Sequence, residues 1–157
     1  MAMDIKVKKL KDNAHLPTRG SDFAAGYDLY AATDNNMPVF IQPHCTEKIG
    51  TGLSFELPSG TYAAIYARSG LATKQGLRPA NCVGICDSDY RGEYIVAVHN
   101  DSEEPRTIVS GDRIAQMILS PYYEMEFTEL DNLSETKRGE GGFGSTDTIE
   151  GVLSSAT

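Results

Sequence analysis

Alternation of apolar and polar residues dominates this chain and predicts short β-strands. Residues 5–9 alternate aliphatic residues with lysines, and the odd positions of residues 49–57 read Ile, Thr, Leu, Phe and Leu. A period of two places such positions on one face of a strand. Pro58-Ser59-Gly60 is a strong turn signal, so we expect residues 61–67 to return as the second strand of a hairpin.

The same alternation continues through the second half of the chain. It predicts strands over residues 93–100, 106–109 and 113–119, and Met125 with Phe127 suggests one more. Only residues 69–75 indicate a helix, which Gly76 would end. Many short strands separated by turns favour an all-β sandwich, jelly roll or barrel with one short helix.

Composition narrows the class of protein. The length of 157 residues suits one domain, and the formal net charge of −8 argues against a broad surface for nucleic acid or anionic membranes, so we expect neither as a partner. No apolar run is long enough to span a bilayer, and the first residues carry no secretory pattern, so we expect a cytoplasmic protein. The three cysteines, Cys45, Cys82 and Cys86, favour free thiols over disulfides or a zinc site.

The composition changes near Leu133. From Ser134 onward the chain is rich in glycine, serine, threonine and charged residues, with few apolar anchors. We therefore expect a β core over residues 1–133 and a flexible, Gly-rich C-terminal tail over residues 134–157, which becomes ordered only when it docks.

The most informative segment is GICDSDYRGE, residues 84–93. A small apolar run ends in Asp87, and Tyr90 follows at once. A carboxylate fixed at a turn can take a proton from water, and an aromatic ring beside it can stack on a sugar or a base. An ordinary acidic hairpin loop is the alternative, because acids and glycine are common in turns.

Four further segments carry candidate chemistry. AAGYDL contains Asp28, and YARSGLA places Arg68 and Ser69 at a helix start, where amides favour phosphate, although Ser69 could equally cap the helix. GDRIAQ sets the polar Gln116 in an apolar strand, where it must find a partner in the core or a ligand. The Gly-rich segment RGEGGFGST could cradle phosphates, although it lacks the ending of a P-loop.

Taken in the order in which they occur along the chain, these five segments resemble the five motifs of the trimeric dUTPase family over about residues 23–146. The resemblance implies a jelly-roll-like (β-clip) fold and a homotrimer whose active sites are shared between chains. It also implies hydrolysis of dUTP to dUMP and pyrophosphate, with Mg²⁺ bound on the triphosphate. This activity keeps uracil out of DNA and supplies dUMP for thymidylate synthesis.

The resemblance also implies roles for the residues around the turn. Asp87 matches the catalytic base, which activates a water for attack on the α-phosphorus. Tyr90 matches the ring that packs under the deoxyribose and excludes a ribose. Asn81 and the backbone near Gly84 match the groups that read the uracil edge.

Phosphate and metal roles follow from the other motifs. The phosphate-binding residues would be Arg68, Ser69, Gly70 and Gln116. Asp28 matches an acid that lies near the waters of the metal, so its contact with Mg²⁺ would be indirect. In the tail, the resemblance implies that Phe143 stacks on uracil, that Arg138 clamps the γ-phosphate, and that the following residues close round the phosphates: Gly144, Ser145 and Thr146.

Cys86 departs from the family pattern, since an aliphatic residue is common at its position, and Cys82 is a smaller oddity. Two alternatives remain open from the sequence. The chain could be a relative of the dCTP deaminase type, or a protein of the same fold with an added regulatory, protein-binding role.

Overall fold

The computed structural model describes residues 3–142, and these form the all-β fold that the alternation predicts, with one α-helix. The strands are β1 (Lys6–Lys9), β2 (Thr18–Arg19), β3 (Tyr27–Tyr30), β4 (Val39–Ile41), β5 (Thr46–Gly50), β6 (Leu53–Glu56), β7 (Thr61–Tyr66), β8 (Leu77–Pro79), β9 (Gly84–Asp87), β10 (Ile95–Asn100), β11 (Arg106–Ile108) and β12 (Arg113–Pro121). The helix α1 spans Ser69–Gln75, and a single 3₁₀ turn, η1, spans Asp34–Asn36.

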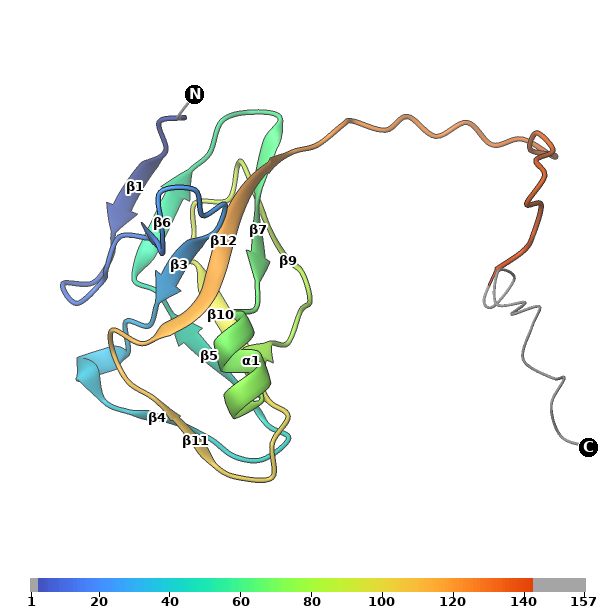
Figure 1. Cartoon of the computed structure of the whole chain (residues 1–157). Helices are drawn as coiled ribbons and strands as arrows, with labels where there is room; N and C mark the ends of the chain where they lie inside the picture. The colour runs from blue at the N-terminus through green and yellow to red at the C-terminus, as the bar shows by residue number, and fades with distance from the viewer. Residues whose placement is uncertain (1–2, 143–157) are drawn as a thin grey trace, which may run out of the picture. The chain divides into compact units, whose positions relative to one another are not determined.

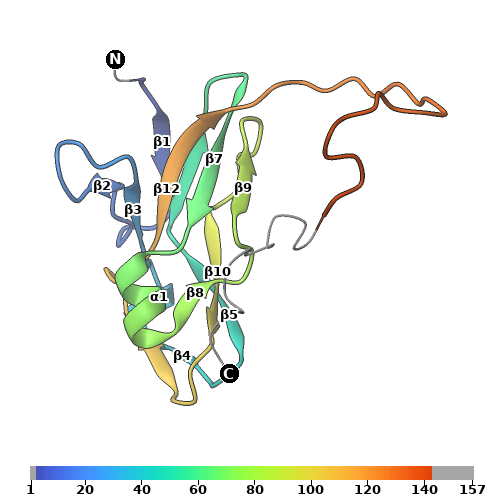
Figure 2. The same ribbon diagram turned by 45° about the vertical axis from the view of Figure 1, so that its right-hand side comes forward.

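Two larger sheets form the body of the core. One has five strands in the order β2-β3-β12-β7-β9, and the other has three in the order β5-β10-β8. Two small pairs, β1-β6 and β11-β4, complete it, and every pairing is antiparallel. In Figures 1 and 2 the long strand β12 runs beside β7, and α1 lies at one end of these strands.

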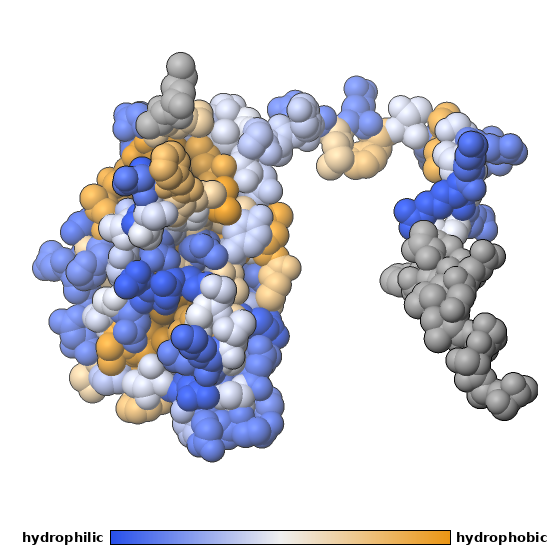
Figure 3. Space-filling view, viewed as in Figure 1, coloured by the Kyte–Doolittle hydropathy of each residue, from blue (hydrophilic) through white to orange (hydrophobic). Residues whose placement is uncertain are grey.

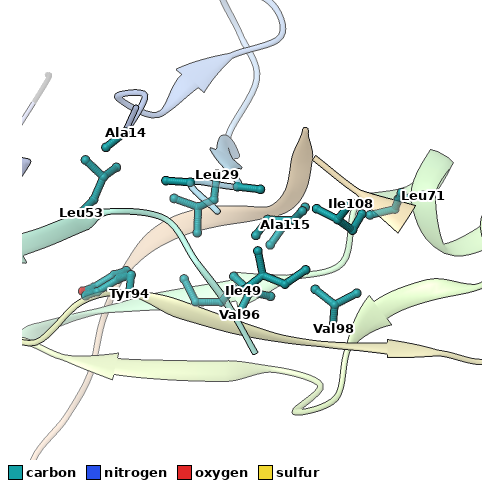
Figure 4. Close-up of a cluster of buried hydrophobic side chains, with 14 of the residues drawn as sticks. Ala14, Leu29, Ile49, Leu53, Leu71, Tyr94, Val96, Val98, Ile108 and Ala115 are labelled. Atoms are coloured by element: carbon teal, nitrogen blue, oxygen red, sulfur yellow. The ribbon is translucent and has the colours of Figure 1, made fainter. Parts of the chain in front are cut away.

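The hydrophobic core takes side chains from both larger sheets. Leu29 and Ile114 come from the five-stranded sheet, and Ile49 and Val98 come from the three-stranded sheet; all are at most 1% exposed. Figure 4 shows these strands meeting over the cluster, with Tyr94 at the end nearest Leu53 and Leu71 at the other end. Burial of this kind is the main stabilising contribution to a fold of this size.

The single strand expected over residues 49–57 is wrong, although its buried face is right. All five odd positions are buried, but the chain breaks at Thr51-Gly52, and its halves β5 and β6 join different sheets. Gly52 has φ +67°, and a Cβ there would lie 2.8 Å from the Cβ of Ala14. The break therefore needs both the left-handed backbone and the absent side chain of glycine.

The expected hairpins are also wrong. The turn at residues 58–60 forms, since the Thr61 amide donates to the Pro58 carbonyl at 3.2 Å, but β6 pairs with β1, and β7 pairs with β12 and β9. Likewise β9 and β10 do not pair with each other. The segment of residues 84–93, hereafter the acidic loop, therefore connects the two larger sheets instead of joining neighbouring strands.

The helix forms over the predicted residues. Gly76 follows it with φ +68°, and its amide donates to the Ala72 carbonyl, so the predicted stop is confirmed. Arg68 occupies the N-cap position and no side chain caps the helix, so the interpretation of Ser69 as a cap is wrong. Ser69 and Gly70, the first residues of α1, are exposed to solvent.

The chain divides into two units, Met1–Tyr123 and Glu124–Thr157. In the second unit no strand forms over the described residues 124–142, so the strand expected near Met125 and Phe127 is absent from the single chain. The boundary expected at residue 133 stays a prediction. Among the residues that the structure describes, no helix is long and apolar enough to cross a membrane.

Candidate active site

A carboxylate held between two guanidinium groups lies on the five-stranded sheet. Arg68 Nε donates to Asp28 Oδ1 at 2.7 Å, and Arg113 Nη1 donates to Asp28 Oδ2 at 3.2 Å. The Asp28 side chain is 12% exposed, whereas that of Arg113 is 51% exposed. The Asp28 carboxylate neutralises only one of the two guanidinium groups. The cluster therefore keeps a net positive charge, which suits an anionic ligand such as a phosphate.

Gln116 completes this arginine cluster (Asp28, Arg68, Arg113 and Gln116). It lies opposite Asp28 on β3 and Tyr66 on β7, and its Nε2 donates to the Ala67 carbonyl at 2.8 Å. Gly26 lies against the other end of the amide, because a Cβ at Gly26 would be 2.6 Å from Gln116 Oε1. The polar side chain in the apolar strand is thus satisfied through Nε2, and its orientation is fixed.

The acidic loop contains β9 and turns sharply after that strand ends at Asp87. The Tyr90 amide donates to the Asp87 carbonyl at 3.2 Å, and Arg91 Nη1 donates to the Ser88 carbonyl at 2.7 Å, so the loop is a tight turn. Glu93 attaches it to the core, since its Oε1 accepts from the Gly52 amide at 2.8 Å. The Asp87 carboxylate is left exposed on a restrained backbone.

A pocket of about 250 Å³ lies against this loop. Six of its lining residues matter for the site: Asn81, Gly84, Cys86, Asp87, Tyr90 and Tyr94. Gly84 keeps the pocket open, because a Cβ there would lie 3.0 Å from Asn81 Nδ2 and 3.2 Å from the Cβ of Ile65. The structure therefore brings together the residues assigned to the water, the sugar and the base.

Tyr94, beside Cys86, is the part of this pocket that the sequence did not point out. Burial raises the pKa of the Tyr94 hydroxyl far above its usual value, and the neighbouring Cys86 thiol adds to this. Burial also raises the pKa of Cys86, so the thiol is mostly protonated at neutral pH. The Tyr94 hydroxyl has no hydrogen-bond partner among the described residues, and a thiol is only a weak one.

The arginine cluster and the acidic-loop pocket lie apart within one chain. Asp87 lies opposite Tyr62, which lies opposite Ser120, whereas Gln116 lies opposite Tyr66. Four residues along a strand and two strand spacings separate the Cα atoms of Asp87 and Gln116 by about 16 Å. The candidate phosphate-binding residues and the candidate base therefore do not converge in the single chain.

The remaining predicted site residues lie on the helix and in the tail. Ser69 and Gly70 form the first turn of α1, and a Cβ at Gly70 would meet nothing within 4 Å. Arg138 is exposed, and its Nε donates to the Gly141 carbonyl at 2.8 Å. The other tail residues lie outside the described residues: Phe143, Gly144, Ser145 and Thr146.

Known sequences similar to this chain agree on one family. The dUTPase family model matches residues 12–147. A deoxyuridine 5'-triphosphate nucleotidohydrolase of Desulfitobacterium hafniense is 52% identical, over 87% of this chain and 90% of the relative. The protein of that name from Yarrowia lipolytica is 46% identical, over 92% of this chain and 89% of the relative.

Solved structures similar to this chain include dUTPases of staphylococcal phages. A mutant dUTPase of phage 80alpha superposes with a TM-score of 0.81 at 26% identity, covering 92% of this chain and 99% of that chain. Another mutant of the phage enzyme, solved with dUpNHpp, has a TM-score of 0.77 at 25% identity with the same coverage. Both the family model and the superposition on solved dUTPases thus confirm the predicted fold class.

Proposed function

The chain belongs to the dUTPase family, and from this we propose that it hydrolyses dUTP to dUMP and pyrophosphate. The observation that carries the proposal is the acidic-loop pocket, where Asp87, Tyr90 and Asn81 line one cavity. The similar phage enzyme solved with dUpNHpp supports a deoxyuridine triphosphate as the substrate. A cytoplasmic location remains a prediction.

Asp87 is the proposed general base. Its carboxylate accepts a proton from a water molecule while the water oxygen forms a bond to the α-phosphorus. The bond between the α-phosphorus and the bridging oxygen breaks, and pyrophosphate leaves with the electron pair. The restrained turn supports this role, because a base must be held within hydrogen-bond reach of the attacking water.

Tyr90 and Asn81 are the proposed determinants of sugar and base. Tyr90 lines the pocket and is 45% exposed, so its ring is accessible to a deoxyribose, and a 2′-hydroxyl would collide with it. Asn81 and the backbone at Gly84 offer donors and acceptors for the uracil edge. A cytosine would leave such groups unpaired, which is costly where the bound base excludes water from them.

The arginine cluster is the proposed site for phosphates. Arg68 keeps donors free beyond those it gives to Asp28, and Ser69 and Gly70 present a hydroxyl and amides beside it. Gln116 lies in the same cluster with its amide fixed on Ala67. Two guanidinium groups around one carboxylate leave a net positive charge, which attracts a triphosphate.

The residues of this cluster fit Mg²⁺ held mainly by the substrate. No group of three or more potential protein ligands exists within residues 3–142, and both Asp28 oxygens already accept from arginines. Mg²⁺ commonly keeps several waters and binds substrate phosphates, so Asp28 would contact it through water. When bound, the ion neutralises charge on the phosphates.

A homotrimer with shared sites is the proposed assembly. The separation of about 16 Å between Asp87 and Gln116 supports it, since the halves of one site would come from different chains. A second, largely apolar pocket of about 680 Å³ lies between β1, β6 and β12, and Figure 3 shows apolar side chains at this end of the core. Tail residues would close the site: Arg138, Phe143, Gly144, Ser145 and Thr146.

A nucleotide panel tests the function directly. Purified protein with Mg²⁺ should release pyrophosphate from dUTP, and much more slowly from UTP, dTTP and dCTP. Absence of pyrophosphate from dUTP would overturn the proposal. Release of ammonia from dCTP would instead indicate the deaminase-type relative.

Asp87→Asn tests the base within this reaction. The variant should bind dUpNHpp normally and lose at least about 10²-fold in kcat, the lower end for general-base catalysis. Asp89→Asn, a neighbouring exposed acid of the same loop, is the matched control and should keep most of the rate. Near-normal turnover by Asp87→Asn would remove Asp87 from the base role.

A further inference from the structure

The Tyr90 ring rests on a second, buried tyrosine. Tyr94 is 2% exposed, and its ring centroid lies 6.1 Å from that of Tyr90 with the planes tilted by 31°. On the core side, Phe55 packs against Tyr94 with centroids 4.5 Å apart. Both separations fall within the range of attractive aromatic pairs. The exposed ring is thus joined to the core through one intermediate ring.

Two further contacts restrain Tyr90 within its own loop. Its hydroxyl donates to the Glu93 carbonyl at 3.1 Å. Gly92 lies under the ring, because a Cβ there would come within 2.8 Å of three Tyr90 atoms, the nearest being the hydroxyl oxygen. These contacts hold the hydroxyl end of Tyr90, and Tyr94 is the aromatic ring that supports its plane.

The Tyr94 hydroxyl is not needed for this support. It is buried without a hydrogen-bond partner among the described residues. The neighbouring Cys86 thiol is at most a weak hydrogen-bond partner, so removal of the hydroxyl should cost the fold little. The ring of Tyr94, and not its hydroxyl, therefore supports Tyr90.

We propose that Tyr94 is a positioning residue for sugar selection: its buried ring fixes the plane of Tyr90 and so determines how closely Tyr90 approaches the 2′ position. The proposal rests on the function proposed above and adds a residue outside the five motifs. Loss of the ring should let Tyr90 tilt toward the core and make room for a 2′-hydroxyl. Selectivity should fall, and binding of the deoxynucleotide should change little.

The test compares affinity for dUpNHpp and UpNHpp by calorimetry, together with kcat/KM for dUTP and UTP. Tyr94→Leu should lower the preference for the deoxynucleotide by about 3- to 10-fold, the size of one aromatic pair. Tyr94→Phe should keep the preference of the unmodified protein and melt at an equal or higher temperature. If Tyr94→Leu does not fold, Tyr94→Ile takes its place.

Phe55→Leu is the matched control, since Phe55 is equally buried and touches Tyr94 at 4.5 Å. It should lower the melting temperature by a similar amount and leave the preference much nearer to normal. An unchanged preference in Tyr94→Leu, or an equal loss in Phe55→Leu, would overturn the proposal. Because the analogues are not hydrolysed, the binding comparison decides this even if the protein fails to cleave dUTP.

Discussion

At the scale of single residues, Gly26 fixes the position of the Gln116 side chain because it has no side chain of its own. A Cβ at Gly26 would lie 2.6 Å from Gln116 Oε1, well inside contact distance, whereas a Cβ at Gly20 would meet nothing within 4 Å. The Gln116 amide can lie against the backbone at Gly26, just before β3, and donate to the Ala67 carbonyl only while position 26 lacks a side chain. One absent methyl group therefore holds a phosphate-binding candidate in place.

We expect Gly26→Ala to displace Gln116 while the fold survives, because a side-chain end can move. A shift of about 1 Å in a positioning group can cost up to about 10²-fold, so kcat/KM for dUTP should fall by about 10- to 100-fold. Steady-state kinetics with a thermal melt measures this. Gly20→Ala should behave like the unmodified protein, and equal activity in the two variants would contradict this role of Gly26.

The raised pKa of Tyr94 makes stability depend on alkaline pH. In the unfolded chain this hydroxyl has its ordinary pKa of 10.0, and in the folded chain the pKa lies higher. Between these values the unfolded state has lost the proton and the folded state keeps it, so the free energy of unfolding falls as pH rises. One such group contributes at most about 1.4 kcal/mol per pH unit.

Tyr94→Phe should therefore lose stability less steeply than the unmodified protein between about pH 9 and 11. Urea titrations across this range measure the slope. Tyr123→Phe serves as control, because Tyr123 is 92% exposed. Identical slopes in all three proteins would show that Tyr94 titrates normally in the fold.

Which site residues the sequence revealed depended on how local their chemistry is. Asp87 and Tyr90 stand in one turn of ten residues, so composition alone made them candidates. Arg113 was missed as a site residue, because its partner Asp28 is 85 positions away in sequence. Tyr94 was missed because in the sequence it reads only as a strand residue, and its contact with Phe55 arises from sheet packing.

At the scale of elements, the local sequence predicted where a helix or strand forms but not which strands pair with each other. Helix α1 and its stop at Gly76 follow from nearby residues, and so they were predicted correctly. The alternation of residues 49–57 continues on both sides of Gly52, so it predicted one strand. It gave no indication that β5 and β6 join different sheets. The residues that pair with β5 and β6 lie 44–53 positions away in sequence, a distance over which alternation cannot specify a partner.

Asn100 shows how one buried side chain links several elements. It is 0% exposed at the end of β10, and its Nδ2 donates to the carbonyls of Ile41 in β4 and Glu104. Its Oδ1 accepts from the amide of Ser102 at 3.0 Å and from the Ser102 hydroxyl at 2.7 Å. The side chain thus closes the turn after β10 onto β4.

Asn100→Ala should lower the free energy of unfolding by about 2–4 kcal/mol, because several buried groups lose their partners at once. Chemical denaturation measures the change. Gln75→Ala, at an exposed residue of α1, is the control and should stay within about 0.5 kcal/mol. A small effect for Asn100→Ala would mean that water replaces these bonds without cost.

At the scale of the whole molecule, the five-stranded sheet holds the arginine cluster and the proposed base Asp87 apart. The arginine cluster lies near one end of β12, and Asp87 lies in register with Ser120 near its other end. A water activated by Asp87 and phosphates held by Arg68 of the same chain would lie too far apart for in-line attack, where reacting atoms must approach within about 3–3.5 Å. The proposed shared site would resolve this, since another copy would bring its own arginine cluster to the acidic loop.

Complementation between two inactive variants tests the shared site. Asp87→Asn and Arg68→Gln should each be inactive, and trimers formed by refolding them together should recover activity. Random mixing leaves about a quarter of the sites with both unmodified residues, so recovery should approach that fraction. Arg68→Gln mixed with Gln116→Ala is the matched control, because both residues belong to one cluster and no site regains both. Failure of the first pair to recover, or a mass equal to the 17.0 kDa monomer instead of three times that value, would place the whole reaction within a single chain.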